Sequence, residues 1–375
     1  MTFKKLIGMA VVLVLLAAAA VWQQKSRAPR RAESVSAETA LLDGVDLNAV
    51  DRIDVTKESS TASVVKKDGR WVVESLYGYP ADFGKLADAL RKAAEVKTGE
   101  PVRSANVDDS EFGLTDDAKA IAVKVGGADA ADITVGARRE ASSSAGWANQ
   151  FFIRRGNGDS VYLVDYDFRP FSENASDWIN KELVRVSSSD IVAVQTGDAE
   201  LKEESGKWTL TDLNADTEDF QTSEANRLRS ALQYFNCATV ADPAKTDADL
   251  GFDAAKEFVA DTKDGFTYTV KIGGETDDGR YVRVAVAYTR LDAPAKPAGD
   301  DADKQSAYEQ ELKAFNETAD ANAKKVDELN AKLSGWTYVI SGYTAESLMI
   351  PRDKLVKAKE KAEEESTKPE PSETI

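Results

Sequence analysis

An internal repeat is the feature of this sequence that most restricts its fold. Gly69, Trp71, Asp82 and Phe83 recur in the same order, at one constant spacing, as Gly206, Trp208, Asp219 and Phe220. Other short matches keep that order, and they pair residues 112–114 (FGL) with 250–252 (LGF), 123–127 (VKVGG) with 270–274 (VKIGG), 152–154 with 281–283, 161–164 with 337–340, and 182–184 with 354–356. The sequence therefore predicts two tandem copies of one unit, residues 45–185 and 186–356, with the boundary near Val186.

Each copy has the same order of expected elements. A turn at Asp68-Gly69 or Ser205-Gly206 leads into a strand through Trp71 or Trp208, which is typical of a β-hairpin. A helix, an acidic loop and further strands rich in Val, Ile, Tyr and Thr follow. Each copy is therefore expected to be an α+β unit, an antiparallel sheet with one main helix, and the repeated Trp most simply fills its core.

The two main helices are expected from capping residues and apolar spacing. In the first copy Asp82 precedes an apolar stripe made of Phe83, Leu86, Leu90, Ala93 and Ala94. In the second copy Thr222 or Ser223 would cap a helix that runs through Leu228, Leu232 and Phe235.

The second copy carries a long helical insertion, residues 291–335, where the first has only a short turn. The spacing of apolar residues predicts a coiled-coil-like helix from about Asp303 to Leu333. The candidate partner-binding residues on it are Tyr308, Leu312, Phe315, Val326 and Leu329. Either an extended segment leads outward and the helix returns as an arm that grips a partner helix or a second copy, or the helix packs its stripe on its own domain.

The N-terminus is expected to hold a single membrane-spanning helix. Lys4 and Lys5 precede the uncharged residues 6–22, which are long enough to cross a bilayer, so residues 1–23 are expected to be a membrane anchor, with a cleaved signal peptide as the alternative. Residues 24–44 are expected to be a polar linker, and residues 357–375 a charged tail that is helical at first. The short N-terminal stub favours an extracytoplasmic body at the inner membrane, although Lys25 and the arginines after it favour the opposite orientation.

Composition excludes several classes of function. The net charge of −17 disfavours nucleic acid as a partner, because phosphates require clustered Lys and Arg. The chain contains no His, which excludes imidazole bases and imidazole metal ligands, and its one cysteine, Cys237, excludes an intrachain disulfide.

No motif in the sequence predicts a catalytic, cofactor-binding or metal-binding residue. The acidic loops at Asp108-Asp109 and Asp247–Asp249 lack the spacing of a calcium loop. Asp165 and Asp167 would share a strand face, and a solvated edge is the preferred interpretation. Ser63 and Lys66 would point to opposite faces of a strand, and Cys237 is expected to be a small buried apolar side chain. The chain is therefore not expected to be an enzyme or to need a cofactor.

The Asp-Gly-Arg-Trp element, the helix that begins Asp-Phe, the Phe-Gly-Leu loop and the N-terminal anchor together resemble the bacterial domain-of-unknown-function 4340 (DUF4340) family. That family has no assigned activity, and its members are often encoded beside gliding-motility-type ABC transporter components. The resemblance implies a periplasmic accessory of such a transporter, which is the expected function. A cell-envelope protein that self-associates through the insertion is the alternative, and a carboxylate-dependent envelope hydrolase is a weaker one.

Overall fold

The computed structural model of the chain describes residues 39–99, 101–102, 108–127, 130–139, 150–298 and 301–359. They form an α+β fold with antiparallel sheets and few helices, as the sequence predicts. They divide into two compact units. Unit 1 comprises the described parts of Met1–Lys66 and Phe83–Glu173, and unit 2 those of Lys67–Asp82 and Asn174–Ile375. The boundary predicted near Val186 stays a prediction, and the expected membrane-spanning segment lies outside the described residues.

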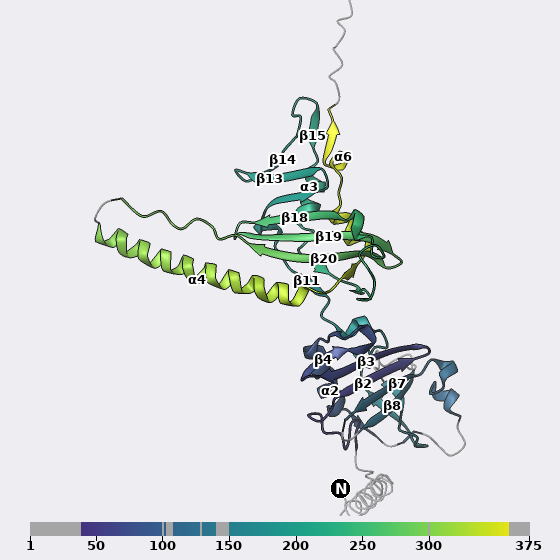
Figure 1. Ribbon diagram of the computed structural model, residues 1–375. Helices are drawn as coiled ribbons and strands as arrows, with labels where there is room; N and C mark the ends of the chain where they lie inside the picture. The colour runs from purple at the N-terminus through teal and green to yellow at the C-terminus, as the bar shows by residue number, and fades with distance from the viewer. Residues whose placement is uncertain are drawn as a thin grey trace, which may run out of the picture. The chain divides into compact units, whose positions relative to one another are not determined.

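The first large sheet has eight strands in the order β10-β9-β8-β7-β2-β3-β4-β5 (Figure 1). Its strands are β2 (Arg52–Lys57), β3 (Ser60–Lys67), β4 (Arg70–Val73), β5 (Tyr79–Pro80), β7 (Ile121–Gly126), β8 (Ala131–Arg138), β9 (Gln150–Arg155) and β10 (Val161–Asp165). Alternating burial explains why these segments are strands. In β2 the apolar residues Ile53 and Val55 are fully buried, and the polar residues between and beside them are not.

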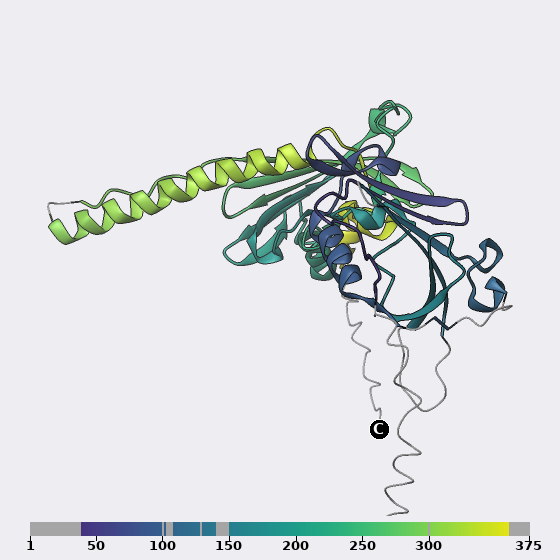
Figure 2. The same ribbon diagram turned by 90° about the horizontal axis from the view of Figure 1, so that it is seen from below.

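Helix α2 (Phe83–Glu95) lies over one face of this sheet (Figure 2). Its buried residues are Leu86, Ala89, Leu90 and Ala93, which recur at helical spacing. Phe83 was expected in this stripe, but its side chain is 62% exposed. The reason is that Phe83 is the first residue of the helix, and the buried face begins one turn later.

Several short elements complete the first part of the chain. They are β1 (Thr39–Ala40), β6 (Lys97–Thr98), η1 (Glu74–Leu76), η2 (Asp109–Phe112), η3 (Asp116–Ala118) and η4 (Ala175–Trp178). β1 pairs with β6, and Leu41 and Leu42 are buried. The linker expected at residues 24–44 is therefore too long, because residues 39–42 belong to the folded body.

The second large sheet also has eight strands, in the order β14-β13-β12-β18-β19-β20-β21-β17. Its strands are β12 (Ile191–Thr196), β13 (Ala199–Glu204), β14 (Lys207–Leu210), β17 (Thr239–Val240), β18 (Lys256–Thr262), β19 (Phe266–Thr276), β20 (Gly279–Tyr288) and β21 (Tyr338–Ile340). Apart from β5 and β17 at the ends, the large strands follow the chain in the same order in both sheets. β10-β9-β8-β7-β2-β3-β4 corresponds in this way to β21-β20-β19-β18-β12-β13-β14.

Helix α3 (Thr222–Arg229) begins where the sequence predicts and ends earlier. Leu232 and Phe235 are fully buried but lie beyond the helix, and Phe235 is in β16 (Phe235–Asn236). β16 pairs with β11 (Glu182–Val184). The helix therefore ends before Phe235, because this residue belongs to the small sheet. The other elements are η5 (Ser188–Asp190), η6 (Phe252–Ala254), β15 (Glu218–Phe220), α4 (Ala302–Leu333), α5 (Gly342–Leu348), α6 (Arg352–Leu355) and β22 (Val356–Ala358).

In each large sheet a loop packs closely against a glycine of one strand. In unit 1 the carbonyl oxygen of Phe112 approaches Gly136 of β8 so closely that a Cβ atom at Gly136 would lie 2.3 Å from it. In unit 2 the carbonyl oxygen of Leu250 stands in the same relation to Gly273 of β19, at 2.5 Å. Gly136 of β8 and Gly273 of β19 are thus comparably placed. The predicted match of residues 123–127 with 270–274 does not fit this placement, because residues 123–126 lie in β7 and residues 270–274 in β19.

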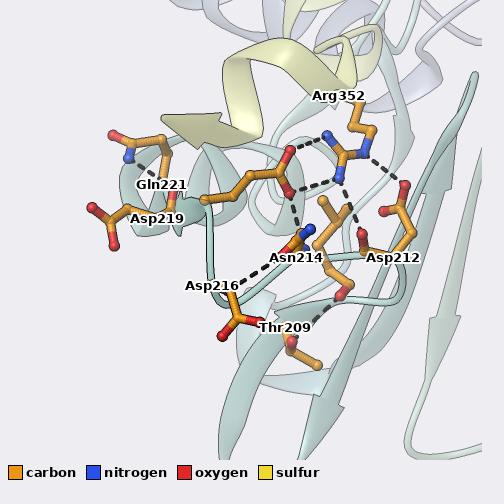
Figure 3. Close-up of polar contacts among 9 residues, drawn as sticks. Thr209, Asp212, Asn214, Asp216, Asp219, Gln221 and Arg352 are labelled. Carbon is orange, nitrogen blue, oxygen red and sulfur yellow. Dashed lines mark hydrogen bonds and ion pairs between the residues drawn. The ribbon is translucent and has the colours of Figure 1, made fainter. Parts of the chain in front are cut away.

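The last described segment of unit 2 is fastened by Arg352 (Figure 3). Its Nε donates to Asp212 at 2.7 Å, and Nη1 and Nη2 donate to the two carboxylate oxygens of Glu218, each at 2.9 Å. The hydrogen bonds from Arg352 to Glu218 lower the pKa of the Glu218 carboxyl. β15, which begins at Glu218, pairs with β22. Residues 357 and 358 are therefore part of a strand and do not begin the helical tail that the sequence predicts.

Candidate functional site: the arm of the second unit

The insertion expected at residues 291–335 forms an arm between β20 and β21. Its helix α4 starts after Asp301, whose carboxylate accepts hydrogen bonds from the backbone N–H groups of Asp303 and Lys304, and ends at Leu333, close to the predicted bounds. At 1.5 Å per residue its 32 residues span ~48 Å. Residues 291–298 run beside the helix, and together they extend beyond the sheet of unit 2 (Figures 1 and 2). The outward segment and returning helix are one of the two arrangements that the sequence left open.

The C-terminal part of α4 is docked on the sheet, and this part of the arm is called the root (residues 319–335). Within β20 only residues Arg280–Val282 pair with β21. The backbone groups along the rest of that edge of β20 therefore need another partner. Asn330 supplies it, because its Oδ1 accepts from the N–H of Val286 at 3.0 Å and its Nδ2 donates to the Val286 carbonyl at 2.7 Å. The amide of Asn330 therefore takes the place of a neighbouring strand.

Further contacts hold the root. The ammonium group of Lys325 lies 5.1 Å from the ring centroid of Phe266, and Lys332 donates to the Glu182 carbonyl at 2.6 Å. Leu333 is fully buried. The second arrangement that the sequence left open, a helix packed on its own domain, therefore applies to this part of α4.

The N-terminal half of α4 packs on the outward segment of the arm. The guanidinium of Arg290 lies 5.2 Å from the ring centroid of Phe315 and donates a hydrogen bond to Asn316. Pro294 and Pro297 are half-buried in the outward segment, and so are Tyr308 and Leu312 on the helix. In this part of the arm the helix packs only on the extended segment, and no sheet lies behind it in Figures 1 and 2.

The five predicted partner-binding residues lie on one face of α4, and all of them are half-buried. Tyr308, Leu312 and Phe315 belong to the outer half, and Val326 and Leu329 to the root. The opposite face is exposed and mostly polar, and it includes Gln310, Lys313 and Glu317. Sequence reasoning did not single out Asn330 or Arg290. A polar residue between Leu329 and Leu333 in an apolar stripe was the available signal for Asn330.

A family model described as "Domain of unknown function (DUF4340)" matches residues 71–255. The match supports the DUF4340 family. No curated protein and no solved structure matches the chain. The DUF4340 match begins at Trp71 and ends before β18, so it does not include the arm. The arm therefore lies wholly outside the matched residues, as do β2, β3 and the strands from β18 onward. Among the described residues, no helix has both the length and the apolar character needed to cross a bilayer.

The acidic loops outside the arm are neutralised by arginines. Asp109 pairs with Arg154 of β9, and Asp247 pairs with Arg283 of β20 at 2.6 Å. The guanidinium of Arg283 also lies 4.1 Å from the ring centroid of Phe252. Nowhere in the described ranges do three His, Cys, Asp or Glu side chains form a group that could hold a metal ion. The equivalent ion pairs in the two units indicate a role in holding each loop on its sheet.

The carboxylates Asp165 and Asp167 line one open cavity of about 630 Å³ together with Lys92 and Lys97. Asp167 is paired with Arg169, whose hydrogen bonds lower the pKa of the Asp167 carboxyl. Tyr166 is half-buried between them, and burial raises its pKa to about 12. A carboxylate hydrolase needs one acid with a raised pKa, and the shift at Asp167 has the opposite sign.

The other nucleophile candidates have structural contacts. Ser63 donates to Asp54 at 2.6 Å, whereas Lys66 is exposed. Cys237 is buried, as expected, and burial raises its thiol pKa to about 11, which leaves it protonated at neutral pH. Trp208 is only half-buried, with the Arg229 guanidinium 4.8 Å above its ring, so it does not fill the core completely.

Proposed function

We propose that this chain is a membrane-anchored, extracytoplasmic binding or scaffold protein that acts as an accessory of an ABC-type transport system. In this proposal its two α+β units are copies of one duplicated module, and its task is recognition rather than catalysis. The contact that matters is made by the outer half of the arm, and the partner is a helix of a transporter subunit.

The arm is the observation that carries this proposal. A 32-residue helix that is docked only at its root exposes far more surface than its own unit needs for stability. The apolar stripe of its outer half, Tyr308, Leu312 and Phe315, is half-buried by a single extended segment. Such a stripe can add a partner helix through residues at helical spacing.

The duplication is supported by the shared strand order of the two sheets. It is also supported by the matched approaches at Gly136 and Gly273 and by the matched ion pairs Asp109–Arg154 and Asp247–Arg283. These features recur at equivalent places and involve no exposed reactive group. In this proposal the repeated module is a structural scaffold, and the insertion in one copy provides the contact surface.

Co-purification from native membranes tests the proposal. The full chain, extracted in a non-ionic detergent, is expected to bring ABC-type transporter subunits with it. In a shortened arm, Gly-Ser-Gly replaces residues 293–314. The ends meet there, because Arg290 contacts Phe315 and Asn316. This variant keeps the root and is expected to lose the subunits.

A pair of matched substitutions refines the test. Tyr308→Ser removes an aromatic side chain of the arm, and Tyr343→Ser removes one that is 74% exposed elsewhere in unit 2. Only the first is expected to reduce recovery of the transporter subunits. Equal recovery with the intact and shortened arms would contradict the proposal, and so would a full chain that associates with itself and brings no transporter subunit.

A further inference from the structure

A cavity of about 340 Å³ lies in unit 2 beside the end of the arm's root. Gly335, Trp336 and Thr337, which directly follow α4, form one wall. Lys245 and Arg283 line it from the loop after β17 and from β20. Its volume is at the lower end of the range of small-molecule sites.

The cavity is rich in hydrogen-bond donors. Arg283 uses Nε for the Thr337 hydroxyl at 2.9 Å and Nη2 for Asp247 at 2.6 Å. Within the described ranges its Nη1 has no hydrogen-bond partner. The ammonium group of Lys245 has one, the Tyr281 hydroxyl at 3.3 Å, and an ammonium can donate three hydrogen bonds. Both cationic side chains therefore keep unused donors.

The lining has few opposing acceptors. Asp242 is its one acidic residue, and Oδ1 of that residue accepts from the N–H of Ala244 at 2.8 Å. Asp247 lies outside the lining and occupies one edge of the Arg283 guanidinium. Two cations thus face one carboxylate in the lining, which favours an anion of single charge.

An aromatic surface completes the cavity. The indole of Trp336 packs edge-on against Tyr79, with ring centroids 4.8 Å apart, which fixes its orientation. The structure gives its indole N–H no hydrogen-bond partner among the described residues. A fixed indole beside unused cationic donors suits a flat apolar group that carries a negative charge.

We propose that this cavity binds a small organic anion, a carboxylate with a flat apolar part that stacks on Trp336 and is held by Lys245 and Arg283. The proposal does not rest on the function proposed above, because none of these residues lies in the outer half of the arm. Unit 1 has the equivalent ion pair Asp109–Arg154, but only residues 156–160 join β9 to β10 there, without a tryptophan.

Titration of the full chain with benzoate tests the proposal, and acetate serves as the probe that lacks the ring. The indole N–H signal of Trp336 is followed by NMR in a non-ionic detergent and is assigned by its loss in Trp336→Phe. Benzoate is expected to shift this signal saturably, with one site per chain, and acetate is expected to bind at least about tenfold more weakly, since it lacks the apolar surface.

Two lysine variants make the test specific. Lys245→Gln is expected to weaken benzoate binding about tenfold or more, because it removes a charged donor. Lys271→Gln changes another exposed lysine of unit 2, paired with Glu257, and is expected to leave binding unchanged. Three results would each overturn the proposal: no saturable shift of the Trp336 signal, unchanged binding in Lys245→Gln, or an equal loss in Lys271→Gln.

Discussion

Asn330 connects the arm to the sheet through one side chain, and its two hydrogen bonds to Val286 are partly buried. Asn330→Ala leaves a backbone donor and a backbone acceptor at the edge of β20 without partners. We expect the free energy of unfolding to fall by about 1–2 kcal/mol. Asn316→Ala, which removes an exposed contact with Arg290, is the control and is expected to change it by less than about 0.5 kcal/mol. Chemical denaturation measures both, and equal effects would contradict the docking role of Asn330.

Gly136 and Gly273 can be tested for equivalent roles in the two sheets. An alanine Cβ would lie 2.3 Å from the Phe112 oxygen in one unit and 2.5 Å from the Leu250 oxygen in the other, so backbone must move in both cases. Each substitution to Ala is expected to lower the free energy of unfolding by about 1–3 kcal/mol. Gly342→Ala in helix α5 is the control, because a Cβ atom there would meet no neighbouring side chain or strand within 4 Å. If either Gly136→Ala or Gly273→Ala behaved like this control, the two loops would not be equivalent.

The Arg352 cluster predicts a pH dependence. The pKa of Glu218 is lowered below its ordinary value of 4.5, first of all by hydrogen bonds from Arg352. A carboxylate with a lowered folded-state pKa stabilises the fold above its unfolded-state pKa, and this contribution is lost as the pH falls through the folded-state value. The melting temperature of Glu218→Gln should therefore fall below that of the unchanged chain at neutral pH, and the difference should disappear well below pH 4.5. A difference that persists in acid would contradict this origin.

Sequence reasoning worked best for elements whose pattern is local. The predicted bounds of α4 are close to those observed, because a long apolar spacing marks them within the segment itself. It failed at α3, where Leu232 and Phe235 continue the helical spacing but are drawn into a turn and into β16 by pairing with β11. That competing partner lies far away in the sequence, so helical spacing alone could not reveal it. Asn330 was missed for the same reason, since its partner Val286 is on another element.

The arm should differ in stability along its length. The root is held by Asn330, Lys332 and the buried Leu333, whereas the outer half has only the outward segment beside it. Hydrogen exchange followed by mass spectrometry is expected to show slow exchange in residues 319–333 and faster exchange in residues 302–315. Replacing Phe315 with Ala should speed exchange in the outer half and leave the root unchanged. Uniform protection along α4 would show that the outer half is stabilised by something other than these contacts.

The predicted repeat rests on short motifs shared along the sequence, and these motifs do not fix which strands of the two sheets are comparable. Residues 123–127 and 270–274 have almost the same letters and lie on different strands, since apolar strands followed by two glycines look alike. Gly136 and Gly273 are recognised as comparably placed only from the carbonyl that approaches each one. Loop and turn motifs are thus better markers of comparable positions than strand sequences, because many different buried strands have similar apolar sequences.

The single cysteine makes the orientation of the whole chain measurable. Cys237 is 3% exposed and its thiol pKa is raised to about 11 by burial, so a maleimide should not label the unchanged chain. Ser306 is exposed on α4, and Ser306→Cys introduces an accessible thiol on the arm. If the body is extracytoplasmic, a membrane-impermeant maleimide will label this variant in intact spheroplasts. Labelling that requires permeabilised membranes would place the arm in the cytoplasm, as Lys25 and the arginines that follow residues 6–22 would favour, and would exclude the proposed location.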